Sequence, residues 1–197
     1  MTKALKFPGA GLVIVLVVYV VCFGLLFLSG YRLSALAAAK AHFTVGPNAK
    51  LLQEVDFGGD IVYLLDTAEG PRTVLCTRRF FLWRAPAAAS LKACSSPVKT
   101  VGWVSYEKGT LLAVEVTDPR VAFIEAGYSG PFSKRVRKEA RIGELIVFKW
   151  EGEGYFLYEL KPVALSSSGE ILYEYRYAVE GHRIMANTAQ WYPVTNR

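Results

Sequence analysis

The chain has 197 residues, of which 52% are hydrophobic, and its formal net charge is +6. A charge of this size suits contact with anionic lipid headgroups or anionic polymers but is modest for a dedicated nucleic-acid binder, so we expect no nucleic-acid partner. The sequence also lacks the spaced ligand sets of metal sites and the glycine-rich loops that hold phosphates, so we expect no metal and no cofactor.

The first predicted element is an uncharged apolar segment near the amino terminus. No charged residue lies between Lys6 and Arg32, and the stretch 12–28 is almost purely aliphatic and aromatic. About twenty apolar residues are enough to cross the hydrocarbon of a bilayer as a helix. We therefore predict a short basic tail over 1–10 and a membrane-spanning helix over 11–30, with the lipid bilayer as a partner.

Two alternatives stay open for this segment. A cleaved signal peptide also starts with basic residues, but its apolar region is shorter, and the nearest pair of small residues, Ala35 and Ala37, lies far beyond the end of this one. A buried helix of a soluble protein is the other alternative. The density of positive charge in the tail, with Lys3 and Lys6, favours a cytoplasmic tail. We therefore expect a single-pass protein of the cell membrane with an extracytoplasmic domain.

The segment 31–47 is predicted to be a helical neck. Its part 34–43 is rich in alanine and other strong helix formers, and Gly46 and Pro47 end the pattern. We expect this helix to continue the membrane helix out of the bilayer. If the protein is an accessory subunit of a membrane assembly, the span and the neck would form the interface with a membrane protein partner.

From residue 48 to residue 197 the chain is predicted to form an all-β domain, because short apolar or alternating runs are separated by turn residues. The predicted strands cover 60–66, 73–83, 101–106, 111–117, 121–126, 144–150, 155–165 and 171–177. Hairpin turns are expected at 107–109 and 166–169, and a long loop at 85–97. Seven or eight strands joined by close turns indicate an antiparallel sandwich or a partly open barrel.

The three cysteines have different expected roles. Cys76 and Cys94 lie in the predicted extracytoplasmic domain, where a disulfide between them would close a loop of about 18 residues. Sequence spacing fixes neither the distance nor the direction of the side chains, so two separate thiols are the alternative. Cys22, in the middle of the apolar segment, is expected to be a packing residue.

One cluster of positive charge stands out in the β domain. The segment 133–141 carries a single acid, Glu139, among five cations, which are Lys134, Arg135, Arg137, Lys138 and Arg141. Such clusters attract phosphates, anionic lipid headgroups or anionic polymers. Basic residues also protect an exposed strand edge against unwanted pairing, which is the alternative interpretation. We predict that the cluster, if the domain has a binding site, forms it.

A catalytic function is a further alternative. Ser96 and Lys99 have the Ser-x-x-Lys spacing of acyl-serine enzymes, in which a lysine activates a serine nucleophile. The companion Ser-Asp-Asn and Lys-Thr-Gly motifs are absent from the sequence. The sequence therefore favours a non-catalytic binding or interaction module at the cell envelope. An extracytoplasmic serine hydrolase and an accessory subunit of a membrane complex are the alternatives.

Overall fold

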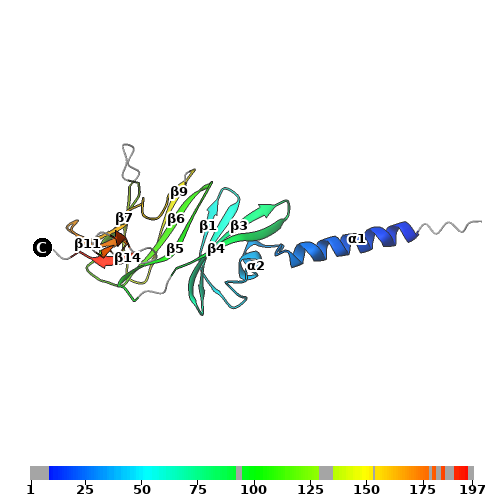
Figure 1. The fold of residues 1–197 in the computed structure, drawn as a ribbon, viewed down its shortest axis with the longest axis horizontal. Coiled ribbons are helices and arrows are strands. Elements are labelled where there is room, and N and C mark those ends of the chain that lie inside the picture. The colour runs from blue at the N-terminus through cyan, green and yellow to red at the C-terminus, as the bar shows by residue number, and fades with distance from the viewer. Residues whose placement is uncertain are drawn as a thin grey trace, which may run out of the picture.

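The computed structural model describes residues 9–91, 95–128, 135–152, 154–177, 179–180, 183–184 and 189–194. Within them, a long amino-terminal helix projects from one end of a body made mainly of β-strands (Figure 1). The strands form three antiparallel sheets and one small two-stranded sheet. The prediction of an all-β antiparallel domain behind one apolar helix is therefore confirmed. The described strands outnumber the predicted seven or eight.

Helix α1 (Gly9–Leu28) is the apolar segment of the sequence. Its stretch Gly11–Leu28 has a mean hydropathy of 3.0, and none of that stretch is buried within the protein. By length and composition α1 is able to cross a membrane, a property that it shares with signal sequences near an amino terminus.

Helix α1 ends in a glycine-based cap and does not continue into the neck. Gly30 has a φ of 88°. Its N–H donates to the carbonyl oxygen of Phe27, and the N–H of Tyr31 donates to the carbonyl oxygen of Leu26. This is the Schellman pattern, in which a glycine in the left-handed conformation terminates the helix. The expectation that the neck continues the membrane helix is therefore wrong, and of the predicted helical neck over 31–47 the part Ala35–Lys40 is helical.

The neck instead contains a short separate helix, α2 (Ala35–Lys40). The hydroxyl of Ser34 accepts a hydrogen bond from the N–H of Ala37 at 3.2 Å and so caps the first turn. The side chains of α2 that are buried are all small, namely Ala35, Ala38 and Ala39. Because they are small, the helix backbone approaches the neighbouring sheet closely, and α2 becomes part of the body.

The first sheet has the strand order β1-β2-β3-β4. Its strands are β1 (Lys50–Phe57), β2 (Asp60–Thr67), β3 (Gly70–Arg79) and β4 (Leu82–Ser90). On the face under α2, Tyr63, Leu65 and Val74 are buried together with the alanines of the helix. Strand β4 lies at the edge of the sheet and accommodates Pro86 where its register with β3 shifts.

The second sheet contains β5 (Val98–Tyr106), β6 (Gly109–Val116) and β9 (Leu145–Glu151), with β6 in the centre. The third sheet has the order β14-β11-β10-β7-β8. Its strands are β7 (Phe123–Ala126), β8 (Val136–Glu139), β10 (Val163–Leu165), β11 (Ile171–Arg176) and β14 (Gln190–Pro193). The two-stranded sheet joins β12 (Val179–Glu180) to β13 (Arg183–Ile184).

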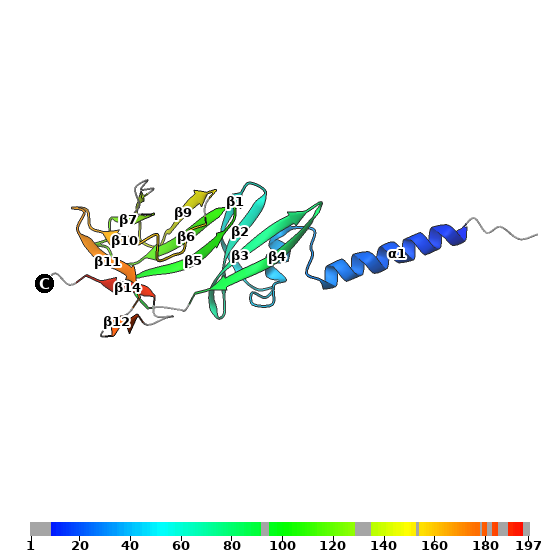
Figure 2. The same ribbon diagram turned by 45° about the horizontal axis from the view of Figure 1, so that its top comes forward.

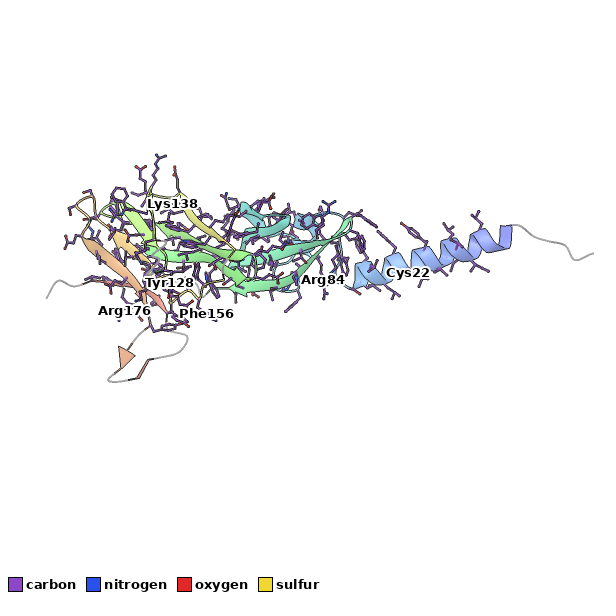
Figure 3. All side chains as sticks on the ribbon, turned by 90° about the horizontal axis from the view of Figure 1, so that it is seen from above. Cys22, Arg84, Tyr128, Lys138, Phe156 and Arg176 are labelled. Carbon is purple, nitrogen blue, oxygen red and sulfur yellow. The ribbon has the colours of Figure 1, made fainter. Side chains whose placement is uncertain are left out.

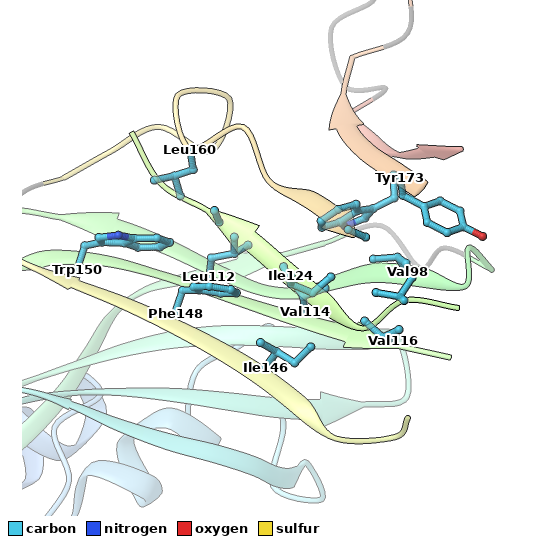
Figure 4. Close-up of a cluster of buried hydrophobic side chains, with 14 residues drawn as sticks. Val98, Leu112, Val114, Val116, Ile124, Ile146, Phe148, Trp150, Leu160 and Tyr173 are labelled. Atoms are coloured by element: carbon cyan, nitrogen blue, oxygen red, sulfur yellow. The ribbon is translucent and has the colours of Figure 1, made fainter. Parts of the chain in front are cut away.

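The three large sheets are stacked, with the second sheet in the middle (Figure 2). Leu64 of the first sheet shares a buried cluster with Leu111 of β6. On the opposite face of β6, Leu112 shares a second buried cluster with Ile124 of the third sheet (Figure 4). Strand β6 is therefore buried on both faces, which explains its unbroken apolar run over 111–114.

Three predictions about strand boundaries are wrong. The predicted strand 73–83 is interrupted by a turn at Phe80 and Phe81. The sequence does not reveal this turn, because neither residue is a glycine or an asparagine. Residues 85–90 of the predicted loop 85–97 belong to β4, although alanine and proline are rare in strands. Of the predicted strand 155–165, only β10 forms.

Candidate functional site

A groove of about 350 Å³ lies on the third sheet. This sheet is at the end of the body farthest from α1, where Figure 3 shows the labelled Arg176. The groove is lined by the residue before β8, by the start of β10 with the two residues before it, and by the end of β11, namely Arg135, Lys161, Pro162, Val163, Glu174, Tyr175 and Arg176. Three cations therefore surround it together with a single carboxylate.

The pairing of β10 with β11 brings two of these cations near each other. The strands are antiparallel, with Val163 opposite Glu174. The N–H of Tyr175 donates to the carbonyl oxygen of Pro162 at 3.0 Å, so Lys161, next to Pro162, lies close to Arg176 in the lining of the groove. Like charges held close together repel each other. A bound anion between them would remove that repulsion.

Lys161 and Arg176 keep their charges available to a ligand. Within the described part of the chain, neither side chain makes an ion pair. The guanidinium carbon of Arg176 lies 4.5 Å from the centre of the Tyr192 ring, which orients the arginine without neutralising it. Lys161 has a φ of 39°, in the left-handed region that non-glycine residues seldom adopt.

Arg135 joins three segments at the edge of the groove. Its Nε lies 2.7 Å from Oε1 of Glu125, and its guanidinium also donates to the carbonyl oxygens of Gly127 and Lys161. Arg137 binds the other carboxylate oxygen of Glu125 at 2.8 Å. The hydrogen bond from Arg135, together with that from Arg137, holds the pKa of Glu125 below its ordinary value. The charged carboxylate therefore fixes Arg135 beside the groove.

The basic cluster predicted from the sequence does not form one continuous surface. Its described members lie on or beside the edge strand β8, where successive side chains point to opposite faces. Lys138 donates to a carbonyl oxygen of β9 at 2.7 Å, and Arg141 lies 3.3 Å from Glu139. Of the described members, Arg135 lines the groove; Lys134 lies outside the described residues. Anion binding by the cluster as a whole stays a prediction.

Sequence analysis does not identify Lys161 or Arg176 as site residues. For Arg176 a signal exists, because the alternation over 171–177 sets it opposite the face of Tyr173, which is buried in the core. Lys161 stands alone in the sequence, and only the pairing of β10 with β11 brings it to the groove.

The predicted disulfide stays a prediction. Cys76 is buried under α2, where its thiol lies 3.4 Å from the carbonyl oxygen of Ala35 and donates to it. Burial raises the pKa of the Cys76 thiol to about 12, so the reactive thiolate is disfavoured. Cys94 lies outside the described residues.

The Ser96 and Lys99 pair does not occupy the start of a helix. Lys99 lies on β5, and its Nζ is 3.1 Å from a carboxylate oxygen of Glu115 on β6. The ammonium of Lys99 therefore has a carboxylate partner across the β5–β6 strand pair. Within the described ranges, no three metal-ligating side chains gather at one place.

Comparison of the chain with known protein families, with curated proteins and with solved structures finds no match. No relative therefore suggests a ligand for the groove. The chemistry of its lining suggests one class: a ligand that carries more than one negative charge and is long or flat enough to lie on a sheet.

Proposed function

We propose that this chain is a single-pass membrane protein whose β body acts as a non-catalytic binding module at the cell envelope. In this proposal α1 is a retained anchor, the basic tail is cytoplasmic, and the body is extracytoplasmic. The groove on the third sheet binds an anionic polymer or an acidic segment of a partner. The length and apolar composition of α1 support the first part, and the lining of the groove supports the second.

One observation carries the binding proposal. Two cations that make no ion pair within the described residues, Lys161 and Arg176, line one groove together with Arg135. A site of this kind is unfavourable when empty and gains stability when it binds an anion. The groove lies at the far end of the body from α1, which favours a ligand beyond the membrane surface over the headgroups of the lipids around α1.

The membrane anchor also explains how a shallow groove suffices for binding. A tether restricts the body to the surface of the membrane and raises its effective concentration towards ligands held in the same layer. Individually weak contacts with a repeating polymer then add to a stable attachment.

The experiment that tests this function measures binding of short-chain polyphosphate to the full-length protein in nanodiscs of neutral phosphatidylcholine. We expect the Lys161→Gln, Arg176→Gln double variant to bind about 10- to 30-fold more weakly than the wild type, since each charge contributes about 1 kcal/mol. A matched control, Lys138→Gln with Arg141→Gln, removes the same charge outside the groove. Equal affinity of the groove variant and the wild type would refute the groove as the binding site. A loss confined to the control would assign binding to the basic cluster instead.

A further inference from the structure

The turn between β3 and β4 carries two exposed aromatic side chains. Arg79 pairs with Leu82, so the turn consists of Phe80 and Phe81 alone. Phe80 is 93% exposed and Phe81 is 59% exposed. The body thus presents two large apolar side chains to its surroundings at the tip of a hairpin.

The backbone of this turn is unfavourable for the residue that it carries. Phe80 has a φ of 55°, a value that two-residue hairpin turns require at their first position and that glycine adopts without strain. A bulky residue at positive φ is strained, and such strain is typical of functional positions. Neither folding nor solubility accounts for a phenylalanine here, because its side chain is neither buried nor polar.

The position of the turn relates it to the end of α1. Arg32, just beyond the end of α1, forms a β-bridge with Trp83 of β4, in which the two backbone hydrogen bonds measure 2.8 and 2.7 Å. Figures 1 and 2 both show the β3–β4 turn at the end of the body that faces α1, about level with the point where the helix ends. A bilayer crossed by α1 would therefore have its surface near Phe80 and Phe81.

The surroundings of the turn are uniformly basic and aromatic. Neither the segment 29–41 nor the segment 77–90 contains an acidic residue. Both segments place arginines over aromatic rings: Arg32 over Phe27 at 4.0 Å, Arg78 over Trp83 at 5.7 Å, and Arg84 over Tyr31 at 5.8 Å. Aromatic side chains and arginines are the residues that proteins place at the boundary between lipid headgroups and hydrocarbon.

We propose that the β3–β4 turn is a second membrane contact of this protein. Phe80 and Phe81 enter the boundary between headgroups and acyl chains beside the exit of α1, and Arg78, Arg79 and Arg84 contact lipid phosphates. This inference rests on the proposed anchoring by α1. Two contacts, one through the bilayer and one on its surface, prevent the body from tilting freely about Gly30. The groove on the third sheet is then held pointing away from the membrane.

The test places an environment-sensitive fluorophore, NBD, at Phe81→Cys in full-length protein whose native cysteines are replaced by alanine. The protein is reconstituted in vesicles of phosphatidylcholine with or without phosphatidylglycerol. We expect blue-shifted NBD emission that is quenched by lipids spin-labelled near the headgroup, more strongly with phosphatidylglycerol. The matched control carries the label at Glu107→Cys, in the two-residue turn between β5 and β6, and should report water. Tryptophan emission, to which the buried Trp150 and Trp191 contribute, reports that each variant is folded.

The outcomes separate this inference from the proposed function. Water-like emission at position 81, from protein that remains in the membrane, would overturn the second contact and leave the anchor intact. Blue-shifted emission without quenching by lipid would show that protein, and not lipid, covers the turn, and would also overturn it. Protein that leaves the vesicles in alkaline carbonate would refute the anchor itself. Replacing Arg78 and Arg79 by glutamine should weaken the effect of phosphatidylglycerol on the quenching.

Discussion

At the scale of single residues, two positions have an unusual backbone conformation. Phe80 and Lys161 are the non-glycine residues of the described chain with positive φ. They lie at opposite ends of the body, one at the proposed lipid contact and the other in the groove. Strained backbone persists where the surrounding structure holds it in place, and it is common at binding sites. The contacts that we propose for these two side chains, and not the turns in which they lie, therefore explain why they occupy these positions.

The strain at Phe80 leads to a prediction about stability. Replacing Phe80 with glycine should raise the free energy of unfolding by about 1 kcal/mol, because glycine relieves the strain and loses no buried contact. Phe81→Gly is the matched control, since Phe81 lies in the same turn without a positive φ and should give no gain. Urea denaturation in detergent, followed by tryptophan emission, measures both changes. An equal or lower stability of Phe80→Gly would contradict the assignment of strain to this residue.

The carboxylate of Glu125 leads to a prediction about pH. Because its pKa lies below the ordinary value of 4.5 in the folded protein, its stabilisation is complete above that pH and is lost as the pH falls below it. Glu125→Gln should lower the free energy of unfolding at neutral pH by about 1–3 kcal/mol. The difference between wild type and variant should shrink in acid, as urea titrations at several pH values would show. A difference that is independent of pH would mean that the ion pairs with Arg135 and Arg137 do not stabilise the fold.

At the scale of helices and strands, sequence predicts the turns that use glycine and misses those that do not. The turns at 107–109 and 166–169 were predictable because Gly109 and Gly169 adopt positive φ there. The β3–β4 turn has no such residue, so the alternation of apolar residues ran through it unbroken. Strand β4 was missed for a related reason, since its pairing with β3 overrides the weak strand preference of alanine and proline.

In the neck and in the groove, too, contacts between residues far apart in the sequence decide what the sequence alone does not predict. Alanine-rich sequence predicted a helix in the neck correctly, but the left-handed Gly30 separates it from α1, and the small side chains dock it on the first sheet. Arg135 was predicted as a binding residue from its charged neighbours. Lys161 was not, because the pairing of β10 with β11, and not sequence proximity, brings it near Arg176.

At the scale of the whole molecule, the proposed lipid contacts and the groove lie at opposite ends of the long axis. Helix α1 and the aromatic turn lie at one end, three stacked sheets form the middle, and the basic groove lies at the other end (Figure 1). A body fixed in the membrane at the first end would present the groove to the layer beyond the lipid. In this proposal the three sheets separate the anchor from the binding surface.

Retention of the intact chain in the bilayer is the claim on which this arrangement depends. The most direct measurement washes membranes from cells producing the full-length protein with alkaline carbonate and determines the intact mass of the chain in the pellet. Our account predicts that the chain pellets with its residues 9–28 still attached. A chain found in the supernatant, or one that has lost this segment to a signal peptidase, would contradict it.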